Sequence, residues 1–422
     1  MQNNSRQYIQ SVSIIGILFF IFGFVTWLNG PLITFVKLAF DLDTDSKAFW
    51  VTTAFYMAYF FLALPSSWIL EKTGMKKGMA LGLLVMAVGT SIFGHFATER
   101  NYPISLLGLF IIGSGLSILQ TACNPYISII GPIESAAQRI SIMGICNKTA
   151  GMLSPIVLSA FVLKDVSSLE EKVKNAADST AREHILNEFA SSIYWPYMIM
   201  ALILVVLAFW ITRSPLPEIK ASEVNAEPVG KTPRNKTSIL QFPYLLLGAF
   251  CIFVYVGVEV MAGDAIGTYG KGFGISSDQT KYFTSFTLFA MLAGYVVGLF
   301  TIPKIISQQT ALKISAWLGI IFTGAALVTH GYWSVGFVAA LGLANALMWP
   351  AIWPLAIEGL GRFTERGSAL LIMGIAGGAI IPRIFATLKD EYDFQWVFFV
   401  IMLPCYLYIL YFSVKGHRVG KA

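Results

Sequence analysis

The chain has 422 residues, of which 56% are hydrophobic and only 12% are charged. Soluble chains carry about 25% charged residues, so this composition excludes a water-soluble globular fold and predicts an all-α integral membrane protein that has the lipid bilayer as its partner. The net charge of +6 is not gathered on a soluble segment that could bind phosphates, so we expect no nucleic-acid partner.

Twelve apolar segments follow one another along the chain, and each is long enough to cross a bilayer as a helix. The first segment is longer than the core of a signal peptide and lacks a small-residue cleavage site, so we expect it to be retained. The expected spans are residues 13–38, 49–70, 76–97, 103–131, 139–163, 193–213, 241–270, 281–302, 310–330, 332–360, 366–389 and 393–414.

A polar segment separates the sixth expected span from the seventh. Residues 214–238 hold four prolines among Lys and Glu residues, a composition that cannot form a packed core and predicts a mobile or loosely helical linker. We therefore expect an N-terminal six-helix bundle over residues 1–213, a cytoplasmic linker over residues 214–240 and a C-terminal six-helix bundle over residues 241–422.

The distribution of basic residues predicts the orientation in the membrane. Lys and Arg are more numerous on the side of both termini and the linker than on the opposite side, where many acidic residues lie. The positive-inside rule then predicts cytoplasmic termini in the plasma membrane, which is the inner membrane if the source is a Gram-negative bacterium. The polar stretch at residues 164–192 is expected to lie outside and to form a short surface helix.

The two halves share a weak sequence repeat. An Ile-Met-Gly-Ile run occurs at residues 142–145 and again at residues 372–375, and two proline motifs, at residues 124–126 and 353–355, lie at equivalent places in spans four and ten. Both separations are about 230 positions, which favours duplicated halves. We therefore predict the major facilitator fold, with twelve transmembrane helices in two pseudo-symmetric six-helix bundles, and we expect a monomer.

The sequence contains no motif typical of an enzyme or of an ATP-driven pump. It has no phosphate-binding loop, nucleophile elbow or zinc-binding helix, and its four histidines are scattered over span ends and loops. We therefore expect no catalysis, no cofactor and no metal site. Polar side chains inside apolar spans are unfavourable to bury, so they are the candidates for function.

Three ionisable residues inside the expected spans stand out. Glu259 and Asp264 lie in span seven, where a buried carboxyl group could carry a coupling proton or sodium ion. Alternatively, Asp264 is solvated near the outer end of its span, and Glu259 pairs with a basic residue. Lys148 in span five needs a partner, and Glu259 is the obvious one. Lys148 could instead neutralise an acidic sugar or extend to the membrane surface.

Amide and indole side chains in the same spans suit a sugar. An amide offers a donor and an acceptor to hydroxyl groups, and a pair of Trp residues one helical turn apart could stack on the apolar face of a sugar ring. Alternatively, the amides bond neighbouring helices and the indoles anchor at an interface. The candidates for substrate binding, together with Lys148, are Asn29, Gln120, Asn124, Asn147, Asn345, Trp349 and Trp353.

Three segments carry a resemblance to a known family: Phe-Val-Thr-Trp-Leu-Asn at residues 24–29, Leu-Gln-Thr-Ala-Cys-Asn-Pro-Tyr at 119–126 and Gly-Pro-Ile-Glu at 131–134. They are similar to segments of the fucose-galactose-glucose:proton symporter family of the major facilitator superfamily, and Gln120 is similar to its glucose/galactose branch. The resemblance covers nearly the whole chain. It implies a sugar–cation symporter in which Asn124 and Asn147 contact the sugar.

The chain departs from this family pattern at two positions. Gly30 stands where the pattern has an aspartate that is a proposed proton-linked site, and Gly144 replaces a sugar-binding Gln in span five. By the half-chain offset, Gly30 lies opposite approximately Glu259. We therefore hypothesise that Glu259, paired to Lys148, replaces the carboxylate missing from the first span.

The leading hypothesis is a secondary transporter that imports a hexose or related sugar with a cation, by alternating access at a midplane site. Three alternatives remain open. The chain could be a non-transporting sugar sensor on a carrier fold, because two family residues are missing. It could carry an acidic or amino sugar, because of Lys148. Efflux of amphipathic drugs fits the Met and Phe content but leaves the polar residues unexplained.

Overall fold

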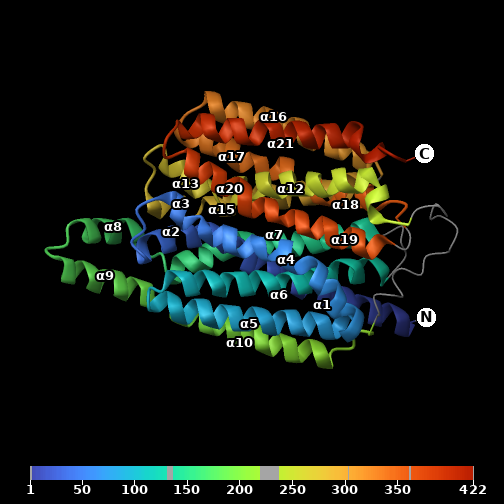
Figure 1. The fold of residues 1–422 in the computed structure, drawn as a ribbon, viewed down its shortest axis with the longest axis horizontal. Helices are drawn as coiled ribbons and strands as arrows, with labels where there is room; N and C mark the ends of the chain where they lie inside the picture. The colour runs from blue at the N-terminus through green and yellow to red at the C-terminus, as the bar shows by residue number, and fades with distance from the viewer. Residues whose placement is uncertain (1, 131–135, 219–236, 303, 361–362, 422) are drawn as a thin grey trace.

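Long helices run side by side along one axis of the molecule (Figure 1). The computed structural model describes residues 2–130, 136–218, 237–302, 304–360 and 363–421, and no β-strand occurs in these ranges. They contain twelve helical segments that are long and apolar enough to cross a membrane, which confirms the predicted number of spans. The sequence predicts each span well because an apolar helix satisfies its own backbone hydrogen bonds.

The helices of the first half lie together, as do those of the second half (Figure 1). The first group comprises α1 (Gln2–Trp27), α2 (Asn29–Ala39), α3 (Asp45–Ala48), α4 (Trp50–Thr73), α5 (Met75–Thr98), α6 (Tyr102–Ile129), α7 (Ala136–Phe161), α8 (Val166–Lys174), α9 (Ser179–Ser191) and α10 (Tyr194–Arg213). The second comprises α12 (Pro243–Gly263), α13 (Ile266–Lys271), α14 (Ser277–Thr280), α15 (Phe283–Thr301), α16 (Gln308–Val328), α17 (Gly331–Asn345), α18 (Met348–Ile357), α19 (Thr364–Met373), α20 (Gly377–Leu388) and α21 (Phe394–Val414).

Three helix pairs form most of the contact between the halves. Helix α4 packs along α19 and α20, and α7 packs along α15. A short 3-10 segment, η4 (Gly374–Ala376), separates α19 from α20 and packs against both α4 and α12. A Cβ atom at Gly377 would lie 1.8 Å from the carbonyl oxygen of Phe253, so only glycine allows α20 to approach α12 this closely. Small residues allow such close contact between helices in membrane proteins generally.

The polar stretch at residues 164–192 forms two helices, α8 and α9, where the sequence led us to expect one. Helix α8 ends at Lys174, and Asp178 then begins α9 by accepting a hydrogen bond from the Ala181 amide at 2.7 Å. Such an N-cap satisfies a backbone donor and favours a new helix start. The predicted mobility of the linker concerns residues 219–236, which lie outside the described part of the chain.

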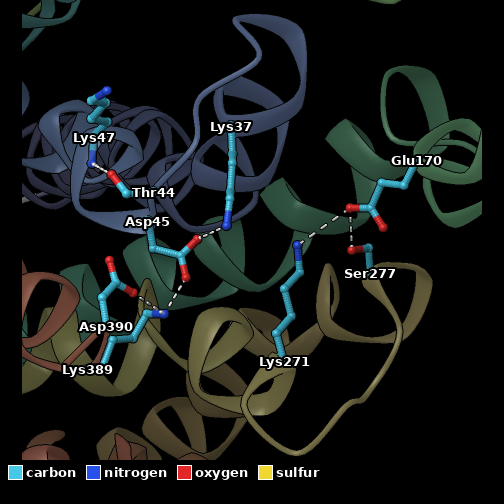
Figure 2. Close-up of polar contacts among 9 residues, drawn as sticks. All are labelled: Lys37, Thr44, Asp45, Lys47, Glu170, Lys271, Ser277, Lys389 and Asp390. Carbon is cyan, nitrogen blue, oxygen red and sulfur yellow. Dashed lines mark hydrogen bonds and ion pairs between the residues drawn. The ribbon is translucent and has the colours of Figure 1, made fainter. Parts of the chain in front are cut away.

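Polar contacts join the two halves at the end of the bundle opposite both termini, which we call the remote end (Figures 1 and 2). Asp45 of α3 lies 2.5 Å from both Lys37 of α2 and Lys389, which follows α20. Burial alone would lower the pKa of Lys389, but the carboxylates of Asp45 and Asp390 raise it above its usual value. The ion pair therefore stabilises the contact between the halves at the remote end.

A second set of contacts ties α8 to the α13–α14 region. Glu170 accepts a hydrogen bond from Ser277 at 2.7 Å and lies 3.8 Å from the ammonium group of Lys271 (Figure 2). Asp278 accepts hydrogen bonds from the backbone amides of Val166 and Ser167. The remote end is therefore closed by polar groups from both halves.

Candidate functional site

Lys148 and Glu259 form a buried ion pair between the two halves. Lys148 lies in α7 and Glu259 in α12, and the Nζ to Oε1 distance is 2.9 Å. The two residues are only 6% and 8% exposed, so the expectation that Lys148 could extend to the membrane surface is wrong. The structure contains the ion pair that the sequence predicted, and the ammonium group is not left free for an acidic ligand.

The indole ring of Trp27 packs against this ion pair. The Nζ atom of Lys148 lies 4.5 Å from the centroid of its ring, a cation–π distance. A Cβ atom at Gly151 of α7 would lie 2.4 Å from the ring, and one at Gly263 of α12 would lie 2.3 Å from it. The indole therefore fills space that two glycines leave open and holds the end of α1 against α7 and α12. The sequence did not single out Trp27 as a site residue, although it belongs to the Phe-Val-Thr-Trp-Leu-Asn segment at residues 24–29.

Asp264 directly follows α12 and is buried, with 1% of its surface exposed. The alternative in which Asp264 is solvated is therefore wrong. Among the described residues neither carboxylate oxygen has a hydrogen-bond partner of normal geometry. The Gly30 amide and the Tyr56 hydroxyl lie close enough to interact with it electrostatically.

Asp264, and not Glu259, is the carboxylate beside Gly30. A Cβ atom at Gly30 would lie 3.3 Å from Oδ1 of Asp264 and 2.4 Å from Oγ1 of Thr284. The half-chain offset related Gly30 to the region of Glu259, but the carboxyl group that lies against Gly30 in space is that of Asp264. A half-chain offset identifies equivalent positions in two repeats, and equivalent positions of two bundles need not touch.

Four buried tyrosines lie around the buried charges, and one of them, Tyr406 of α21, interacts electrostatically with Glu259. The other three, Tyr56 of α4, Tyr255 of α12 and Tyr295 of α15, also interact electrostatically with Glu259, and Tyr56 interacts with Asp264 as well. Each is at most 5% exposed. The sequence analysis missed them, and the signal that could have found them is a tyrosine in the middle of an apolar span.

Gly144 lies against one of these tyrosines. A Cβ atom at Gly144 would lie 2.4 Å from Cε1 of Tyr295. The Tyr295 ring thus occupies the space into which a longer side chain at position 144 would extend. This packing gives a physical reason why glycine stands there.

The predicted amide residues separate into two groups. Asn29 is 2% exposed and donates to the Thr26 carbonyl at 3.0 Å, and Asn345 is fully buried and accepts from the Tyr406 hydroxyl at 2.9 Å. These contacts are typical of helix packing. Three amides are half-buried instead: Gln120, which donates to the Tyr59 hydroxyl at 3.0 Å, Asn147, which donates to the Phe19 carbonyl at 3.3 Å, and Asn124.

Asn124 and both predicted tryptophans line one cleft between the halves. The cleft has a cavity volume of about 20 Å³, room for about one water molecule, and its lining consists of Asn124, Ile140, Trp349, Pro350, Trp353 and Pro354. It lies in the half of the bundle nearer the termini, since Ile140 is in the first turn or so of the described part of α7. The structure therefore brings together an amide and two indoles in a solvent-accessible space.

The two tryptophans stack on each other, with ring centroids 5.3 Å apart and an interplanar angle of 27°. Trp349 also contacts Tyr255, at a centroid distance of 6.3 Å. Tyr255 lies beside Glu259, so aromatic contacts connect the cleft with the buried ion pair. A ligand that moved Trp349 would thereby act on the charged residues as well.

Comparison with known proteins identifies the superfamily to which the chain belongs. The sequence model of the Major Facilitator Superfamily matches residues 15–380. A glucose/galactose transporter of Brucella abortus is 30% identical over 419 residues, which cover 99% of this chain and 96% of the relative. An L-fucose-proton symporter of Escherichia coli is 26% identical over 390 residues, covering 92% of this chain and 88% of that one.

Among solved structures, the chain is similar to the transporter FucP in its outward conformation. The TM-score is 0.76 at 21% identity, and the match covers 97% of this chain and 99% of that one. At this identity the likeness shows the fold, which is the predicted major facilitator fold.

Proposed function

Because the chain belongs to the major facilitator superfamily, and within it to the fucose-galactose-glucose:proton symporter family, we propose that it imports a hexose or related sugar together with a cation. It does so as a monomer in the plasma membrane with cytoplasmic termini. The observation that carries this proposal is the aromatic and amide cleft, connected through Tyr255 to buried charges between the two halves. A carrier needs this connection to couple two solutes.

The sugar binds at the cleft of Asn124, Trp349 and Trp353, which widens to admit it, because its volume in this conformation is about that of one water molecule. Indole rings suit the apolar face of a sugar, and the amide suits its hydroxyl groups. Gln120 and Asn147 extend the polar surface available to the sugar, and their present hydrogen bonds to protein groups can be exchanged for bonds to hydroxyls. Asn29 and Asn345 are too buried for direct contact in this conformation and position their helices for binding.

The cation binds in the region of the two buried carboxyl groups, Glu259 and Asp264. A proton is supported by the printed name of the Escherichia coli relative, and sodium is the other candidate. The cleft lies toward the termini while polar contacts close the remote end, as in a carrier that faces the cytoplasm. The paired state of Lys148 favours a neutral sugar over an acidic one.

Counterflow in proteoliposomes tests the transport proposal. Vesicles loaded with unlabelled D-glucose or D-galactose are diluted into labelled sugar, and we expect transient accumulation that Trp353→Ala and Asn124→Ala each reduce at least tenfold. Trp333→Ala is the matched control, because Trp333 is 79% exposed and outside the cleft, and it should leave counterflow unchanged. Sugar binding without counterflow would instead establish a sensor, and flux of acidic or amino sugars alone would correct the substrate class.

A further inference from the structure

Three charged side chains meet in the buried space between the halves, and their charges do not balance. Lys148 and Glu259 neutralise each other at 2.9 Å. Asp264 interacts electrostatically with both Lys148 and Glu259. No ion pair among the described residues joins Asp264 to a basic side chain. One carboxyl group therefore remains without a counter-charge.

The groups around Asp264 do not supply a counter-charge. The groups that face it are the Tyr56 hydroxyl of α4, the Gly30 amide at the start of α2, and the ion pair of Lys148 and Glu259. None of these adds a net positive charge. An ionised carboxylate without a partner is strongly disfavoured in a buried site, whereas a protonated carboxyl group is neutral.

The space beside Asp264 is also closed to a larger ion. The Thr284 hydroxyl lies there but already donates to the Gly263 carbonyl at 2.7 Å. A single carbon added at Gly30 would lie 2.4 Å from that hydroxyl oxygen. A metal cation needs several oxygen ligands at about 2.0–2.6 Å and room for itself, so the packing favours a proton.

Resting on the proposed symport, we propose that Asp264 is the residue that carries the coupling proton. Its carboxylate takes up one proton from the outer solution when it is exposed at the remote end, and the resulting neutral carboxyl group can be buried as the halves close. The same proton leaves to the cytoplasm after the sugar departs. Glu259 keeps its ion pair with Lys148 and positions Lys148 and Tyr255.

This assignment separates two roles that both carboxyl groups could have filled. Glu259 links the charged cluster to the cleft through Tyr255 and Trp349, whereas Asp264 responds to the proton gradient. Gly30 lies beside the same carboxyl group, and its missing side chain leaves room for the Thr284 hydroxyl, which a Cβ atom would approach to 2.4 Å.

The test compares Asp264→Asn with Glu259→Gln in the full-length protein, reconstituted in proteoliposomes with D-glucose and D-galactose as probes. Asn mimics the protonated acid in shape and charge. We expect Asp264→Asn to lose accumulation driven by a proton gradient at least tenfold, while counterflow persists and no longer varies with pH. Glu188→Gln is the matched control, since Glu188 is an exposed acid on α9, and it should behave as the wild type does.

A second measurement does not depend on transport. Adding sugar to purified wild-type protein in weakly buffered solution should cause proton uptake, and the Asp264→Asn protein should bind sugar without it. Gradient-driven accumulation by Asp264→Asn, or dependence of wild-type accumulation on sodium, would overturn the assignment. Loss of the pH response in Glu259→Gln alone would overturn it as well. If the wild type itself shows no counterflow, the proposed function fails, and the proton-uptake experiment still tests Asp264.

Discussion

The ammonium group of Lys148 and the carboxylate of Glu259 lie 2.9 Å apart, although they belong to opposite halves of the chain. The pair is buried, so each charge depends on the other for its stability. It therefore holds α7 and α12 together, and any conformational change that separates these helices must also move or break the pair.

Removing one member of this pair should destabilise the protein more than removing both charges. We expect Lys148→Met and Glu259→Gln each to lower stability by about 3 kcal/mol, because each leaves an unpaired buried charge. The double variant, which leaves none, should recover most of the loss. Thermal unfolding of the purified proteins measures all three. A double variant as unstable as the sum of the single ones would show that the charges do not interact.

Adding a methyl group at Gly30 should also destabilise the protein, since the new carbon would lie 2.4 Å from Oγ1 of Thr284. We expect Gly30→Ala to lower stability by about 1–3 kcal/mol, the usual range for overpacking. Thr284→Ala removes the clashing oxygen, so the double variant should regain stability. Gly324→Ala is the matched control, because nothing lies within 4 Å of a Cβ atom there. Equal unfolding midpoints for Gly30→Ala and Gly324→Ala would contradict this prediction.

A disulfide bond that links the two halves at the remote end should stop transport. The hydroxyl oxygens of Ser46 and Thr387, which come from opposite halves, lie 3.0 Å apart. We expect the double variant Ser46→Cys, Thr387→Cys to form a disulfide under mild oxidation and to lose counterflow until a reductant is added. Each single cysteine variant controls for the substitution itself. Full counterflow by the oxidised, cross-linked protein would show that the remote end does not open during transport.

The ion pair of Lys389 should stabilise the protein only below strongly alkaline pH. Its pKa is raised above the model-compound value of 10.5, so the folded state binds its proton more tightly than the unfolded state does. The stabilisation is complete below about pH 10 and is lost as pH rises through the folded pKa. The difference in unfolding midpoint between the wild type and Lys389→Met should therefore narrow above pH 10.5. Lys164→Met, at an exposed lysine, should show no such change.

Sequence reasoning succeeded where one local rule decides the outcome. An apolar run of sufficient length must be a helix in a membrane, so the spans could be counted. A lysine in the middle of such a run needs a carboxylate as its ion-pair partner, and Glu259 is the partner of Lys148. The burial of Asp264 could not be predicted, because it depends on Gly30 and Thr284 from helices remote in sequence. For the same reason the position of Trp27 between Gly151 and Gly263 follows only from the packed helices.

The cleft, too, has one feature that the sequence predicted and one that it did not. The helical spacing of Trp349 and Trp353 predicted that they share a face, and they do stack. Spacing along one helix says nothing about which residue of another helix faces that pair, so helical spacing did not separate Asn124 from Asn345, and only the family resemblance favoured Asn124. The structure distinguishes them, because Asn124 lines the cleft and Asn345 is buried against Tyr406.

The polar contacts at the remote end differ from the interior ion pair in their access to water. Lys37 keeps 37% of its side chain exposed and Glu170 keeps 40%, whereas Lys148 keeps 8%. Dissolved salt screens exposed charges over about 8 Å at physiological ionic strength but hardly reaches buried ones. Ionic strength therefore weakens the exposed ties of Lys37 and Glu170, acts less on the ion pair of Asp45 and Lys389, whose side chains are 13% and 15% exposed, and spares the centre of the molecule. Raising the salt concentration on the outer side alone would favour opening at that end without disturbing the charges that couple the two solutes.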